Sequence, residues 1–215
     1  MRSPLAKKLS TVKIGSGVRE MEDSVFLLCP KLAEFIFSED NEAFKSVDVN
    51  LYSKNGKTIV KYAMGKGDII SIPNGVTSIG KGSFSNCFAL CSAVLPSNIT
   101  QIPNAMFSHC EKLTGITIPG GVKTIGENAF FMCESLESVI VLQSVESIGI
   151  GTFSSCNKLV EIVISDSVSS IGVNAFSCYK MTSINISSAL TSISAGTFSA
   201  CIRRINYVTL KHIIH

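Results

Sequence analysis

Hydrophobic positions recur along this chain with a period of 23 residues, from Val76 to about Leu210. Each repeat begins with an aliphatic residue, followed by Ile after three residues, Phe after five more and Cys after three more. The aromatic and sulfur columns are Phe84, Phe107, Phe130, Phe153, Phe176 and Phe198, and Cys87, Cys110, Cys133, Cys156, Cys178 and Cys201. One residue is missing before Cys178, and one is added before Ile205. Because the columns keep a common register, the period describes one structural unit repeated along the chain.

Each repeat closes with a short alternating segment, such as Ile116-Thr117-Ile118, which favours a strand with two side chains inward and one outward. A unit of this size cannot bury its apolar side alone, whereas stacked units share one continuous core. Successive strands would pair in parallel at about 4.7–4.9 Å per coil. The pattern predicts an α/β-class solenoid over residues 1–215, with short parallel strands, turns or short helical returns, and about eight to nine coils.

The repeat also carries a specific motif, Ile-Pro-x-x-Val-x-x-Ile-Gly-x-x-Ala-Phe-x-x-Cys-x-x-Leu. It stands here as Ile118, Pro119, Val122, Ile125, Gly126, Ala129, Phe130, Cys133 and Leu136. This pattern resembles the BspA-like (Treponema pallidum type) leucine-rich repeat over nearly the whole chain. The resemblance implies a leucine-rich-repeat solenoid of the horseshoe type. It also implies a surface or secreted protein of host-associated bacteria or parasitic protists, with roles in adhesion and in binding extracellular-matrix proteins.

The period breaks once, between Phe37 and Ile72, and residues 38–69 read as an insertion. Asn55-Gly56 stands between two alternating runs and predicts a β-hairpin with a type I′ turn. The segment Leu51 to Ile59 is similar to a "LYSKDGKTL" hairpin of the same family. We expect the insertion to replace the convex return of one coil, and a binding role for it is the alternative.

The outward position of each closing strand forms a row of exposed side chains. These residues are Ile36, Ser71, Val94, Thr117, Ile140, Val163, Asn185 and Thr209. In a horseshoe fold this row would line the concave face, where extended binding surfaces form. Its middle part is uncharged and partly apolar, which is typical of a protein contact. The alternative is the ordinary preference of Val, Ile and Thr for strands.

Candidate chemistry is sparse. The ladder cysteines would stack about 4.8 Å apart, too far for a disulfide, so we expect buried free thiols. Cys91, outside the ladder, has no second pair of ligands for a metal. His109, His212 and His215 lack the spacing of a catalytic triad or a metal site. The sequence therefore predicts no enzyme activity, no cofactor and no metal.

Composition excludes further classes. A net charge of +3, with scattered lysines and no basic stripe, argues against nucleic-acid binding. Apolar runs such as Val139 to Leu142 are too short to span a bilayer. Two sequons begin at Asn98 and Asn185, and chance accounts for them unless the chain is secreted by a eukaryote.

The ends leave two interpretations open. The basic segment after Met1 has no apolar region behind it and is not a signal peptide. Leu9, Val12 and Ile14 match the end of a repeat, so the chain opens mid-repeat, as expected for a fragment of a longer array or for short natural ends. Uncapped ends would permit an end-to-end dimer. The functional prediction is a non-enzymatic, protein-binding surface module, and the alternative is a structural or intracellular scaffold.

Overall fold

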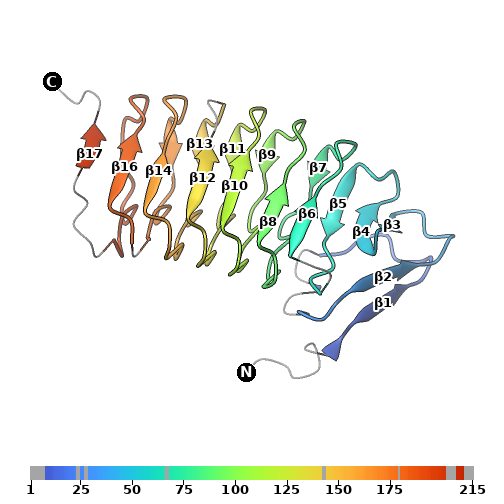
Figure 1. Ribbon diagram of the computed structural model, residues 1–215. Coiled ribbons are helices and arrows are strands. Elements are labelled where there is room, and N and C mark those ends of the chain that lie inside the picture. Colours follow the sequence, from blue (N-terminus) through green and yellow to red (C-terminus); the bar gives the residue numbers. More distant parts are fainter. Residues whose placement is uncertain are drawn as a thin grey trace.

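The protein is an elongated solenoid of short β-strands (Figure 1). The computed structural model describes residues 8–22, 25–26, 29–65, 68–141, 144–178 and 180–201, and the backbone alone of 207–210. Buried hydrophobic side chains form one continuous core along the described chain, from Ile14 to Ile186. The predicted solenoid with a period of about 23 residues is confirmed.

The longer strands of the array lie side by side on one face, which we call the strand face (Figure 1). They are β6 (Ile69–Ser71), β8 (Ser92–Val94), β10 (Gly115–Ile118), β12 (Ser138–Val141), β14 (Glu161–Val163), β16 (Ser183–Ile186) and β17 (Tyr207–Leu210). All their pairings are parallel, within one sheet of β6, β8, β10 and β12 and another of β14, β16 and β17. At the N-terminal end, β1 (Thr11–Ile14) and β2 (Glu34–Phe37) form a separate parallel pair.

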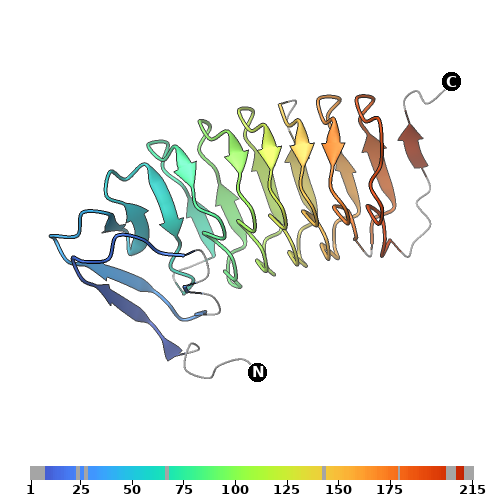
Figure 2. The same cartoon turned by 180° about the vertical axis from the view of Figure 1, so that it is seen from behind.

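The chain returns on the other side through two-residue strands, which face the viewer in Figure 2. They are β7 (Ser78–Ile79), β9 (Gln101–Ile102), β11 (Thr124–Ile125), β13 (Ser147–Ile148) and β15 (Ser170–Ile171). Between these strands and the strand face the described returns are turns, and no α-helix is present in them. Their N–H groups bond to the next coil, as from Phe107 to the carbonyl of Ala129 (2.7 Å) and from Phe130 to that of Thr152 (2.9 Å). In an α-helix these N–H groups would bond to carbonyls of their own segment. Because they bond to the next coil instead, the described returns are turns, and not the short helical returns that were the other expectation.

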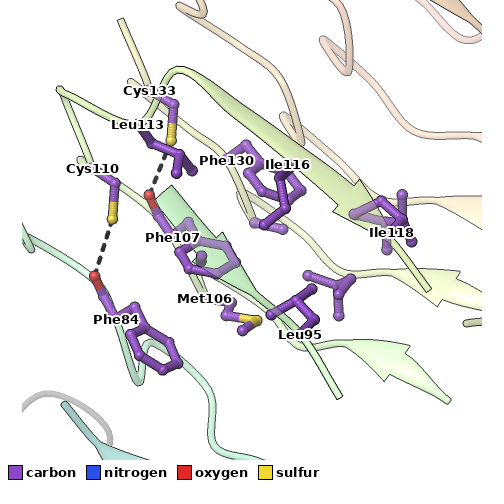
Figure 3. Close-up of a cluster of buried hydrophobic side chains, with 14 of the residues drawn as sticks. Phe84, Leu95, Met106, Phe107, Cys110, Leu113, Ile116, Ile118, Phe130 and Cys133 are labelled. Atoms are coloured by element: carbon purple, nitrogen blue, oxygen red, sulfur yellow. Dashed lines mark hydrogen bonds between the residues drawn. The ribbon is translucent and has the colours of Figure 1, made fainter. Parts of the chain in front are cut away.

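Phenylalanine rings stack through the middle of the core. From Phe84 to Phe176 adjacent ring centroids lie 5.3–5.5 Å apart, and the rings of Phe130 and Phe153 are within 3° of parallel. Figure 3 shows part of this stack. Each ring buried in this way contributes about 1.5–3 kcal/mol relative to exposure. The phenylalanine ladder is therefore a main source of stability.

The ladder cysteines from Cys87 to Cys201 form no disulfides. From Cys110 onward they donate hydrogen bonds to carbonyl oxygens of the preceding coil. These bonds run from Cys110 to Phe84 (3.2 Å), Cys133 to Phe107 (3.1 Å), Cys156 to Phe130 (3.1 Å), Cys178 to Phe153 (2.8 Å) and Cys201 to Phe176 (3.2 Å). Two of them are drawn in Figure 3. Burial raises the pKa of the Cys133 thiol to about 12. These thiols are packed, hydrogen-bonded core groups with suppressed nucleophilicity.

The insertion folds as an antiparallel meander of β3 (Phe44–Val47), β4 (Asn50–Ser53) and β5 (Thr58–Lys61). Its last strand pairs in parallel with β7, so that Ile59 lies beside Ile79. The ring of Tyr62 packs against Phe84 in a tilted arrangement, with centroids 5.3 Å apart. The end of the insertion thus occupies the return position of a coil and begins the aromatic stack.

The prediction of a type I′ turn at Asn55-Gly56 is wrong about the type of turn. That turn needs positive φ at both central residues, and of this pair only Gly56 has it, at 71°. The loop is closed instead by the side chain of Asn55, whose Oδ1 accepts a hydrogen bond from the Lys57 N–H at 2.9 Å. The two-residue turn with positive φ at both positions is Asp48-Val49, between β3 and β4.

The array makes about seven turns, slightly fewer than the eight to nine expected. The difference arises at the insertion. There β2 pairs with β1. β5 follows β4 in an antiparallel pair and then lies beside β7 on the return side. The number of coils across residues 38–69 therefore cannot be obtained by dividing the length by the repeat period.

Candidate functional site

The strand face presents the predicted outward row in register. Parallel pairing places Ser71 beside Val94, Thr117 beside Ile140 and Val163 beside Asn185. The remaining members behave differently. Ile36 lies in the separate β1–β2 pair. The backbone of Thr209 pairs with Asn185, and its side chain lies outside the described part of the structure.

Aliphatic side chains dominate the exposed surface of this row. Val94, Ile140 and Val163 are exposed to 57%, 55% and 59%. Thr117 lies exposed between the first two. No member of the row carries a charge. The row is an uncharged, largely apolar stripe across successive coils.

A second outward row runs beside it, partly exposed and partly half-buried, and was missed in the sequence. It comprises Ile69, Ser92, Gly115, Ser138, Glu161 and Ser183, joined by the same parallel pairings. Its first residue, Ile69, is 69% exposed. The strands begin one residue earlier than the alternating triplets suggested, so each has two outward positions. The alternation rule applied one position earlier would have found this row.

A shallow groove of about 520 Å³ lies over β8, β10 and β12 between the two rows. We call it the Gly115 groove, and its lining includes Ser92, Val94, Gly115, Thr117, Ser138 and Ile140. The residues that line it are all uncharged. β8 and β10 are registered only at Ser92 and Gly115, whereas four pairs join β10 to β12. The groove thus lies over two strands of one sheet that are paired at a single position.

A second groove of about 350 Å³ lies between β2 and β3. Ile36, Phe37 and Phe44 line it together with charged side chains. The charged members are Glu34, Glu39, Lys45 and Lys54. The ammonium group of Lys54 donates to the carbonyl of Glu39 at 3.1 Å. This groove therefore offers both signs of charge, unlike the Gly115 groove.

Groups with catalytic or metal-binding chemistry do not converge in the described part of the chain. No cluster of three or more His, Cys, Asp or Glu side chains suited to a metal occurs there. His109 stacks edge-on against Phe131, with ring centroids 5.4 Å apart. His212 and His215 lie outside the described residues. Nor do the described residues include a helix with the length and apolarity to cross a membrane.

The remaining titratable groups fit a structural role. Burial raises the pKa of the Tyr52 and Tyr62 hydroxyls. Ion pairs between side chains are solvated, as between Lys123 and Glu146 at 2.9 Å, with each side chain more than half exposed. Such pairs contribute little to stability.

The two sequons differ in accessibility. Asn98 is exposed in the turn before β9, and its side-chain amide donates to the carbonyl of Asn74 at 3.0 Å. Asn185 is half-buried in the outward row of β16. Of the two positions, Asn98 offers the more open site for a modifying enzyme.

Comparison with known proteins places this architecture. Six copies of the BspA type leucine rich repeat region match the chain over residues 5–58, 57–177 and 102–214. A search of curated proteins found no match.

Solved structures share the fold. The T. pallidum leucine rich repeat protein TpLRR is 27% identical, with a TM-score of 0.65 over 76% of this chain and 78% of that one. A leucine rich cell surface protein of Faecalibacterium prausnitzii is also 27% identical, with a TM-score of 0.57 over 76% of this chain and 48% of that one. The pneumococcal vaccine antigen PcpA, 22% identical, has a TM-score of 0.57 over 87% of this chain and 41% of that one. The chain thus spans less than half of the last two proteins.

Proposed function

The chain belongs to the BspA-type leucine-rich repeat family, and from this we propose that it is a non-enzymatic protein-binding module displayed at a cell surface. Its ligand would be a host or extracellular-matrix protein, held on the strand face. The family match and the likeness to a leucine rich cell surface protein support the surface location.

The exposed aliphatic stripe carries this proposal. Val94, Ile140 and Val163 are each more than half exposed and lie in one row of the strand face. Isolated apolar residues on a surface need no explanation, whereas contiguous ones mark contact sites. Strand propensity can account for each β-branched residue taken singly. It does not require one at every position, because the same row also contains Ser71 and Asn185. An exposed, uncharged and largely aliphatic surface over several coils suits a protein ligand.

The make-up of the stripe also indicates how the coils would share the binding energy. Each coil presents only one or two outward side chains, so affinity must come from several coils acting together. The row is uncharged and the net charge is only +3, which leaves little long-range steering. We therefore expect an association rate typical of unsteered protein pairs and a modest dependence on salt.

Binding of the purified chain to a panel of extracellular-matrix and serum proteins tests the proposal. An Ile140→Arg, Val163→Arg double variant would place two charges in the stripe. The matched control is Ile150→Arg, Val173→Arg, because both residues are exposed aliphatics outside the strand-face elements, at 48% and 39%. Circular dichroism would verify that each variant folds.

The expected result is a panel protein that binds the parent and the control but not the stripe variant. Binding that survives in the stripe variant would move the contact away from the strand face. A parent that binds no panel protein would favour the scaffold alternative. Antibody labelling of intact cells would then decide whether the protein is displayed at the surface.

A further inference from the structure

We propose that the Gly115 groove is a subsite for a single uncharged aliphatic side chain, contributed by an extended segment of the protein partner. This inference rests on the proposed function, because it names the part of a protein ligand that the strand face would recognise. Residues that fill such pockets often carry much of the energy of an interface.

The absence of a side chain at Gly115 opens the groove. Ser92 and Ser138 occupy the equivalent positions of the neighbouring coils. Gly115 does not have a left-handed φ, so the backbone does not require glycine here. A Cβ at this position would lie 3.1 Å from the Ser138 hydroxyl oxygen, a flexible group. Glycine in a strand often marks close approach of a ligand or another chain, and here it leaves the Ser138 hydroxyl uncovered on the groove side.

The strand arrangement gives the groove its width. β10 pairs with β12 at four positions, from Gly115 with Ser138 to Ile118 with Val141. On the other side, β10 pairs with β8 only at Ser92 and Gly115. The two strands are therefore less closely matched beyond that pair, toward Thr117. The groove lies over this part of the sheet and extends onto β12.

The lining selects the chemistry of the occupant. Val94 and Ile140 contribute apolar side chains to the lining, and Ser92 and Ser138 contribute hydroxyls that the backbone of an extended segment could bond to. A charged side chain placed here would lose water without gaining a counter-charge, which is unfavourable. The lining residues are neither aromatic nor charged, so stacking with an aromatic or cationic group is not favoured over burial of an aliphatic one. The β2–β3 groove, with its Glu and Lys side chains, differs in this respect.

The test uses small probes and needs no identified partner. N-acetyl-leucine amide would be titrated into the isotope-labelled chain, with N-acetyl-aspartate amide as the charged comparison, while backbone amide shifts are followed by NMR. Gly115→Val would fill the groove with a residue that strands favour. Ser183→Val is the matched control, because Ser183 lies in the same outward row outside the groove.

We expect saturable shifts at the amides of Gly115 and Thr117 with the leucine probe and at least about tenfold weaker binding of the aspartate probe. Since burial of one aliphatic side chain changes affinity about tenfold to about a hundredfold, Gly115→Val should lose the response by that factor. Ser183→Val should keep it. If Gly115→Val does not fold, Ser138→Leu fills the groove from the neighbouring strand and should have the same effect.

Shifts that do not saturate, equal binding of the two probes, or an unchanged response in a folded groove-filling variant would each overturn the subsite. These outcomes are separate from those of the protein panel. Leucine-probe binding without any panel ligand would leave the subsite standing and remove the adhesive function. A panel ligand that binds the groove-filling variants as well as the parent would leave the adhesive function standing and remove the subsite.

Discussion

The thiol of Cys133 donates a hydrogen bond to the carbonyl oxygen of Phe107, in the preceding coil, over 3.1 Å. The same oxygen accepts the N–H of Cys110 at 3.0 Å. One carbonyl therefore closes the turn of its own coil and holds the side chain of the next. This explains why a small side chain that buries well and donates weakly suits the column.

Alkaline pH should destabilise the protein through these thiols. Burial raises the pKa of Cys133 to about 12 and raises those of Cys110 and Cys156 well above the usual value. In the unfolded chain a thiol ionises near pH 8.5. Stability from the neutral buried thiol is therefore complete below about pH 8.5 and is lost as pH rises toward about 12. Urea unfolding at a series of pH values would measure the decline.

The control for this effect is Cys133→Ala, which removes one titrating group. Its free energy of unfolding should be lower at neutral pH, because a hydrogen bond and packing are lost. Its further decline above about pH 9 should be shallower than that of the parent. Parallel declines in the two proteins would mean that Cys133 does not couple ionisation to folding.

Truncation in the aromatic stack should depend on position. Phe130→Ala removes a fully buried ring with stacked neighbours at 5.5 and 5.3 Å and should cost about 3–5 kcal/mol. Phe198→Ala should cost less, because this ring is half-buried and lies 6.2 Å from Phe176. Chemical denaturation of both variants gives the comparison. Equal losses would contradict a ladder whose contribution depends on two-sided packing.

Glycines at the tight returns should resist even the smallest substitution. A Cβ at Gly149 would lie 2.6 Å from the backbone nitrogen of Glu127, an atom that cannot turn aside. Gly149→Ala should therefore destabilise by about 1–3 kcal/mol. Gly75→Ala is the control, because nothing lies within 4 Å of its added Cβ. Comparable thermal midpoints for the two variants would show that adjacent coils can separate to admit a methyl group.

Asn41 should be a further point of sensitivity. Its buried side chain donates to the carbonyls of Gly15 and Val18, at 2.8 and 3.0 Å, and accepts the N–H groups of Ala43 and Phe44, at 3.0 and 2.8 Å. Asn41→Leu keeps the size but leaves these four groups without that partner, and should cost about 2–4 kcal/mol. Hydrogen exchange should show faster exchange at the amides of Ala43 and Phe44. Unchanged protection there would mean that water replaces the side chain without loss.

The repeat made the solenoid predictable because like residues at a fixed period can only be buried together by stacking. The returns were harder to predict, since His109 and Met132 take left-handed φ although neither is a glycine. Ile193 keeps its place in the isoleucine column yet is 44% exposed, and its segment forms no return strand. Periodicity identifies a column but does not say whether a neighbouring coil covers it.

The candidate surface was predicted only in part. The outward row followed from alternation, but the adjacent row with Ile69 needed the true strand starts. The Gly115 groove depends on how β8, β10 and β12 are arranged side by side, which is a property of packing between coils. Asn41 was overlooked because a lone asparagine in a loop gives no sign of the contacts it will make with residues far along the chain.

The bonding of each return to the next coil has a mechanical consequence. A coil adds only about 4.8 Å to the length of the stack, while its 23 residues span about 75–80 Å when pulled straight. Tension applied to the two ends would peel coils one after another, and each release would lengthen the chain by about 70 Å or more. Under load such an array would lengthen in steps, coil by coil, because no single contact holds all the coils together.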